Sequence, residues 1–139
     1  MATAIRLRRE HIDAMIDHAK QDAPIECCGL LASRDGEVVS LHRARNREKS
    51  PYRFDIDPLE TKKILEAIED SGADLAGFYH SHTGSPAVPS PTDVRMMGPL
   101  FGPPYIHFVI GLEDPETPSV RAWYIEGAEK TEQKYDLVD

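Results

Sequence analysis

The residues best suited to chemistry lie between Gly77 and Asp93. His80 and His82 stand two positions apart at the end of an apolar run, and Asp93 follows after a short loop. Because successive side chains of a strand point to opposite faces, positions i and i+2 share a face and would present both imidazoles together. Two neutral imidazoles and a carboxylate suit Zn²⁺, and a catalytic zinc leaves its fourth position to water. The segment therefore predicts a site for one zinc ion per chain, with His80, His82 and Asp93 as candidate ligands.

The same residues also have a purely structural interpretation. A strand can end in two histidines that act as ordinary polar residues. Ser90-Pro91-Thr92-Asp93 is typical of a helix start, with Ser90 as the N-cap, Pro91 as the first helical residue and Asp93 completing a capping box. The segment alone leaves both interpretations open, and a hydrolytic site also requires a general base elsewhere in the chain.

Length and composition indicate one globular domain, residues 1–139. Of the 139 residues, 40% are hydrophobic and 29% are charged, and no apolar run approaches the ~20 residues of a membrane helix. The N-terminal residues lack the apolar core of a signal peptide, so a cytoplasmic location is expected. The net charge of −8 argues against nucleic acid or an anionic membrane as the main partner.

Two local features add alternatives. Basic residues cluster between Arg43 and Arg53, either as a solvated strand edge and loop or as a patch that attracts an acidic partner. Cys27 and Cys28 are adjacent, too close for a relaxed disulfide, and no other cysteine is available for a zinc site. We interpret both as small buried core residues of a protein in a reducing compartment.

Hydrophobic periodicity and turn residues divide the chain into strands and helices. Apolar residues within 9–23 recur at i, i+3, i+4 and i+7, as on one face of an amphipathic helix, and Asp35-Gly36 predicts a tight hairpin. Hairpins flank the central units, so we expect one mixed sheet with flanking helices. The expected strands are residues 4–8, 27–32, 38–44, 52–56, 74–79, 105–112, 120–126 and 131–138, and the expected helices are 9–23, 58–71 and 91–97.

Glu26 is the candidate acid/base. A hydrolytic zinc site needs a carboxylate that takes and relays the proton of the metal-activated water. Glu26 lies where a loop enters an apolar strand, and the small residues after it allow close packing. Its pattern alone favours a surface glutamate that precedes a strand.

At this point the chain resembles a known family. Glu26, His80-Ser81-His82, Ser90 and Asp93 match the spaced motif of the JAMM (MPN-plus) metalloproteases, and the flanks Cys27-Cys28-Gly29-Leu30-Leu31 and Gly77-Phe78-Tyr79 agree. The resemblance implies a cytidine-deaminase-like α/β/α sandwich with a mixed, curved sheet. It also implies that His80, His82 and Asp93 bind zinc, that Glu26 is the general base and then acid, and that Ser90 stabilises the oxyanion. Ser81 is expected to point away from the metal.

The resemblance further implies a substrate class. The chain is similar to the short bacterial branch, with Thr83 after the second histidine, whose members resemble peptidases of ubiquitin-like sulfur-carrier proteins ending in Gly-Gly. Such a tail fits a narrow groove and pairs as an added strand, for which we expect 52–56 to form the edge. The remaining histidines (His11, His18, His42 and His107) are interpreted as surface or packing residues.

Three alternatives remain beside a zinc peptidase. The first is a non-catalytic MPN scaffold or interaction module of the same fold, although every motif position is filled here. The second is another zinc hydrolase, but the Pro-Cys-x-x-Cys of nucleobase deaminases is missing and a TIM barrel needs ~250 residues. The third, a metal-storage protein, would explain the ligands but not Glu26 and Ser90.

Overall fold

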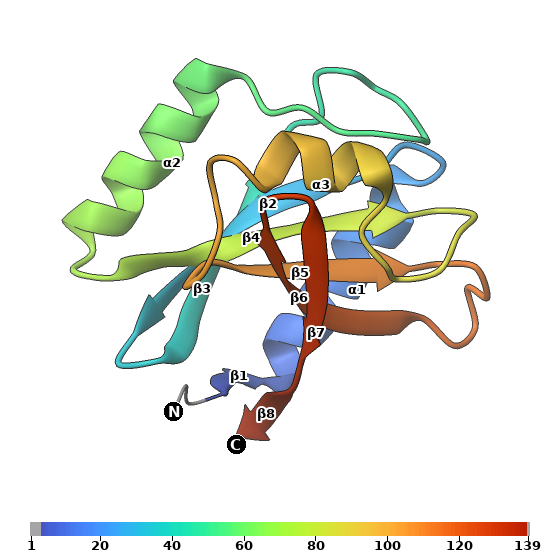
Figure 1. Cartoon of the computed structure of the whole chain (residues 1–139). Coiled ribbons are helices and arrows are strands. Elements are labelled where there is room, and N and C mark those ends of the chain that lie inside the picture. Colours follow the sequence, from blue (N-terminus) through green and yellow to red (C-terminus); the bar gives the residue numbers. More distant parts are fainter. Residues whose placement is uncertain (1–3, 139) are drawn as a thin grey trace.

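The computed structural model describes residues 4–138, which form an eight-stranded sheet with three helices (Figure 1). The order across the sheet is β7-β6-β5-β4-β2-β3-β1-β8. β4 pairs with β5, and β1 with β3 and β8, in parallel, whereas the other pairs are antiparallel, which confirms a mixed sheet. The strands are β1 (Ile5–Arg8), β2 (Cys28–Arg34), β3 (Glu37–Ala44), β4 (Asp74–His82), β5 (Ile106–Gly111), β6 (Ser119–Glu126), β7 (Glu129–Gln133) and β8 (Tyr135–Val138).

The sheet is strongly curved. β7 and β8 stand at opposite ends of the strand order, yet only Lys134 separates them in the sequence. One residue spans about 3.6 Å at most, so the two outer strands must meet and the sheet must curl to allow it. Figure 1 shows β7 continuing into β8 beside β1.

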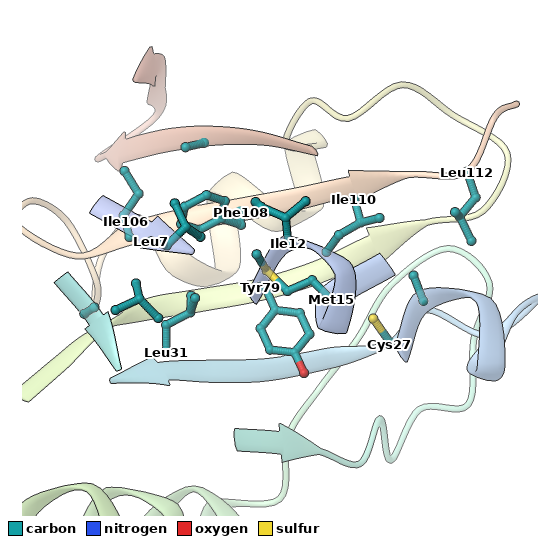
Figure 2. Close-up of a cluster of buried hydrophobic side chains, with 14 residues drawn as sticks. Leu7, Ile12, Met15, Cys27, Leu31, Tyr79, Ile106, Phe108, Ile110 and Leu112 are labelled. Atoms are coloured by element: carbon teal, nitrogen blue, oxygen red, sulfur yellow. The ribbon is translucent and has the colours of Figure 1, made fainter. Parts of the chain in front are cut away.

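Helices cover both faces of the sheet. α1 (Arg9–Asp22) packs on one face, where Met15 joins Tyr79 in a buried cluster (Figure 2). α2 (Pro58–Asp70) and α3 (Pro91–Met97) cover the other face through a second cluster. The α/β/α arrangement predicted from the family resemblance is confirmed. Within residues 4–138, no helix is long and apolar enough to cross a bilayer.

One expected strand was wrong, and another is divided in two. Residues 52–56 form no strand, because the Asp55 N–H donates to the side-chain oxygen of Asn46 and the Asp55 carbonyl accepts from the Arg47 N–H. This segment bonds within its own loop and is not part of the sheet. Its role as the edge for a substrate tail stays a prediction. The expected strand at 131–138 is two strands that pair with opposite ends of the sheet, β7 with β6 and β8 with β1.

Gly77 allows β4 to lie against β5. The two strands pair in parallel with Gly77 opposite Ile106, and a Cβ at Gly77 would overlap the Ile106 backbone. Gly77→Ala is therefore expected to lower the free energy of unfolding by about 1–3 kcal/mol. Urea unfolding measures this, with Gly84→Ala as the control, since a Cβ at Gly84 meets nothing within 4 Å. Equal stability of the two variants would contradict this account of the contact.

Candidate metal centre and catalytic carboxylate

The two histidines lie on the last residues of β4. His80 is paired with Cys28 of β2 and Val109 of β5, so strands on both sides fix its backbone. Both imidazoles are buried, and their Nε2 atoms lie 3.2 Å apart. The i, i+2 spacing on a strand thus brings the two rings together, as predicted.

Asp93 reaches the histidines from the first turn of α3. The Ser90 hydroxyl accepts from the Asp93 N–H at 3.1 Å, and Asp93 Oδ2 accepts from the Ser90 N–H at 2.9 Å. The same Oδ2 atom lies 2.9 Å from His80 Nε2 and 3.1 Å from His82 Nε2. The capping box and the ligand cluster therefore share one carboxylate, and the cap aims it at the two rings. Asp93 is therefore both a helix-capping residue and a candidate metal ligand.

The three side chains fit a tetrahedral metal ion. Their facing atoms are 2.9–3.2 Å apart. Bonds of 2.0–2.1 Å in a tetrahedron separate ligand atoms by about 3.3 Å, and two imidazole nitrogens with one carboxylate oxygen suit Zn²⁺. Asp93 is 1% exposed, and its Oδ1 has no hydrogen-bond partner among the described residues. A buried carboxylate without enough partners is costly, and a cation would offset that cost.

Neighbouring groups orient both imidazoles. His82 Nδ1 lies 2.8 Å from the Pro86 carbonyl, which can only accept, so Nδ1 donates. This hydrogen bond leaves the Nε2 lone pair of His82 for a metal. His80 stacks on the buried ring of Phe54, with centroids 4.6 Å apart. Phe54 was missed as a site residue, because its alternation with Tyr52 and Ile56 suggested only a strand.

Glu26 lies two residues before β2 and is 2% exposed. Burial raises its pKa to about 8, with smaller effects of His82, which lowers it, and Asp93, which raises it. Cys28 pairs with His80 and Cys27 bonds Ser81, so the antiparallel register places Glu26 opposite His82, beside the cluster. Its Oε1 has no hydrogen-bond partner within residues 4–138. A buried carboxyl group with its pKa near neutrality can both take and release a proton at physiological pH.

Ser81 connects the segment that carries Glu26 to the histidine strand. Its hydroxyl accepts from the Cys27 N–H at 2.8 Å, and its own N–H donates to the Cys27 carbonyl at 3.2 Å. Ser81 therefore bonds backbone next to Glu26 rather than joining the histidine cluster. Cys27 and Cys28 are buried free thiols, as expected of core residues.

The basic residues between Arg43 and Arg53 are partly neutralised within the fold. Arg47 pairs with Asp55 and Asp57, and Arg53 pairs with Glu48. Among the other histidines, His18 is buried against the Tyr79 hydroxyl on the face opposite the cluster, and His107 bonds the Phe101 carbonyl. Neither belongs to the group of potential metal ligands.

Burial of Glu26 has a consequence for the metal-free protein. The unfolded chain loses this proton near pH 4.5, whereas the folded chain keeps it to about pH 8. Between these values the folded state binds more protons, so this residue's contribution to stability falls as pH rises. Glu26→Gln should remove that fall. In chelator, we expect the free energy of unfolding of Glu26→Gln, relative to that of the wild type, to increase by roughly 2–4 kcal/mol between pH 5 and pH 8.

Urea unfolding of the metal-free proteins at both pH values measures this difference. Glu48→Gln, which changes an exposed carboxylate, is the control and should follow the wild type. Parallel pH curves for the wild type and Glu26→Gln would show that Glu26 ionises normally in the fold.

Comparison with known proteins agrees with this geometry. Residues 8–126 match the family model described as prokaryotic homologs of the JAB domain. A CysO-cysteine peptidase of Mycobacterium tuberculosis is 33% identical over 136 residues, which are 96% of this chain and 90% of that protein. A desampylase of Haloferax volcanii is 40% identical over 99 residues, which are 66% of this chain and 71% of that protein.

Solved structures include a similar chain. Protein DSY2949 of Desulfitobacterium hafniense superposes with a TM-score of 0.85 and is 31% identical, covering 97% of this chain and 93% of its own. The likeness therefore extends over the whole sheet and all three helices, and is not confined to the histidine segment.

Proposed function

This chain is a hydrolase of the prokaryotic JAB (JAMM/MPN) family, and we propose that it is a zinc-dependent peptidase or isopeptidase. Its substrate would be a ubiquitin-like sulfur-carrier protein, cleaved after the C-terminal Gly-Gly. The supporting observation is the convergence of His80, His82 and Asp93 beside the buried carboxyl group of Glu26. The similarity to a CysO-cysteine peptidase and a desampylase supports the substrate class.

In this proposal, His80, His82 and Asp93 would hold one Zn²⁺. When bound, the ion would supply Lewis-acid chemistry that makes water a nucleophile near neutral pH. Glu26 takes a proton from the attacking water and then delivers it to the leaving nitrogen. Burial disfavours the charged carboxylate, so Glu26 can hold the proton between the two transfers.

Ser90 would stabilise the oxygen of the scissile carbonyl. Its Oγ accepts from the Asp93 N–H, so its hydroxyl hydrogen stays free to donate to a substrate. The side chain is half-buried at the start of α3, beside the ligand carboxylate. Loss of one such donor typically raises the barrier by about 2.7–4 kcal/mol.

A direct test is to incubate the zinc-loaded protein with a ubiquitin-like carrier ending in Gly-Gly-Cys or Gly-Gly-Lys and to measure the masses of the products by mass spectrometry. We expect a carrier that ends in Gly-Gly and a released amino acid. A carrier ending in Ala-Ala-Cys is the control, because the proposed specificity for Gly-Gly depends on tail residues that carry no side chain. A fully zinc-loaded protein that cleaves neither Gly-Gly carrier would overturn the proposal.

A reducing, cytoplasmic location is part of the proposal. Cys27 and Cys28 are both free and buried, which suits a compartment where thiols stay reduced. A sulfur-carrier tail would meet the enzyme in the same compartment. Cell fractionation with an antibody to the chain would test this, and recovery from a secreted fraction would contradict it.

A further inference from the structure

Asn46 is a buried amide that uses all of its hydrogen-bonding capacity. It lies two residues after the end of β3 and is 5% exposed. Its Nδ2 donates to the carbonyls of Glu26 at 3.1 Å and Arg53 at 3.0 Å. Its Oδ1 accepts from the N–H groups of Glu48 at 3.0 Å and Asp55 at 3.1 Å. Two donors and two acceptor sites are the full inventory of an asparagine side chain.

These contacts join the loop 46–57 to the backbone of Glu26. The Asn46 amide holds the Glu26 carbonyl, and the Glu26 N–H donates to the carbonyl of Ser50 in the same loop at 3.0 Å. Both backbone polar groups of Glu26 are therefore bonded to one loop. Glu26 lies outside every strand, so the ladder of β2 does not fix it.

The same amide also places an aromatic ring against the histidine cluster. Asn46 bonds Arg53 and Asp55, the two residues that flank Phe54. Phe54 is buried, and its ring stacks on His80. One side chain thus fixes the backbone on both sides of the ring that packs against a candidate ligand.

We propose that Asn46 is a positioning residue for the reaction, which holds Glu26 and the Phe54–His80 stack in one rigid frame. All four of its side-chain hydrogen bonds go to backbone groups of the loop and of Glu26, so it would act through other residues. The role in catalysis rests on the proposed function. The structural part, that Asn46 fixes the backbone of Glu26, stands on the hydrogen bonds alone.

Asn46→Ala removes all four hydrogen bonds, and Asn46→Asp is the variant closest in shape. Aspartate keeps the acceptors for Glu48 and Asp55 but turns carboxylate oxygen toward the carbonyls of Glu26 and Arg53. For both variants we expect kcat to fall about 10–100-fold, with KM within about threefold and zinc content unchanged, because misplacing a catalytic group lowers the rate without removing binding contacts.

Arg47→Gln is the matched control. This substitution breaks the ion pairs of Arg47 with Asp55 and Asp57 in the same loop. The Arg47 side chain makes no hydrogen bond to Glu26. Its kcat should stay within about twofold of the wild type. If Arg47→Gln lowered kcat as much as the Asn46 variants, general loosening of the loop would explain the loss and the inference would fall.

Hydrogen exchange gives a readout that does not depend on activity. In metal-free and zinc-loaded protein, Asn46→Ala should speed exchange of the Glu26 amide, while the paired amides of β2 stay protected. Asn46→Asp provides the same readout if the alanine variant fails to fold. Unchanged exchange at Glu26, or wild-type kcat in both variants, would overturn the inference. A wild type that cleaves no carrier would overturn the proposed function, whereas exchange would still decide whether Asn46 fixes Glu26.

Discussion

Glu26→Gln is expected to bind zinc as the wild type does and to lower kcat/KM for cleavage after Gly-Gly by about 10²–10⁴-fold. Gln has the shape of Glu but cannot take or release a proton. The carboxyl group lies beside the ligands without belonging to the group of potential metal ligands, so its replacement should leave zinc binding intact. The two measurements are zinc content by metal analysis and product formation by mass spectrometry.

A nearby carboxylate provides the control for this experiment. Glu48 is exposed and pairs with Arg53, so Glu48→Gln should keep both zinc and activity. A Glu26→Gln enzyme with near-normal activity would remove Glu26 as the proton carrier. A Glu26→Gln protein without zinc would instead indicate that the carboxylate helps to bind the metal.

The parts of the site that could be predicted depend on local geometry. His80 and His82 share a face because they are two residues apart on a strand, and Asp93 is aimed by a capping box that spans four residues. Neither relation needs knowledge of the rest of the fold. The order of the elements also followed from hydrophobic period and turn residues, with the exceptions at 52–56 and 131–138.

The parts that escaped prediction depend on contacts between distant segments. Asn46 follows a strand, which is an ordinary place for a turn residue, and nothing local indicates that its amide crosses to Glu26. The alternation of Tyr52, Phe54 and Ile56 reads as a strand, but the backbone of Asp55 bonds within its own loop. Glu26 could be proposed from its place before an apolar strand, but only the family resemblance favoured it over a surface glutamate, because its burial depends on distant segments, among them the loop that bonds its backbone.

His80→Ala and His82→Ala are expected to lose both zinc and cleavage, with activity at least about 10³-fold lower, because the ion supplies several kcal/mol of transition-state stabilisation. Each substitution removes one of only three protein ligands in the proposed site. Metal analysis after dialysis and the same cleavage assay measure both effects. His42→Ala is the control, since His42 bonds Ser40 and lies outside the ligand group, and it should keep both properties.

Loss of the metal should also lower the melting temperature of the wild type. A ligand that binds only the folded state stabilises it by about 4 kcal/mol at a thousandfold excess over its Kd. The wild type should therefore melt at a lower temperature in a chelator and recover with added Zn²⁺. The two histidine variants should melt at the same temperature with or without the chelator. Retained zinc in either variant would show that the ion binds elsewhere.

Asp93→Asn separates the two roles of Asp93. An asparagine oxygen can still accept from the Ser90 N–H, so the capping box of α3 should survive in the metal-free protein. The variant should nevertheless lose zinc-dependent stabilisation, because a neutral amide replaces the carboxylate that faces His80 and His82. In chelator it should melt at a lower temperature than the wild type. Burial raises the pKa of Asp93, but His80, His82 and the Ser90 N–H together hold that pKa below its usual range, so the carboxylate stabilises the folded state near neutral pH. A shift in melting temperature on adding Zn²⁺ as large as that of the wild type would show that the carboxylate does not bind the metal.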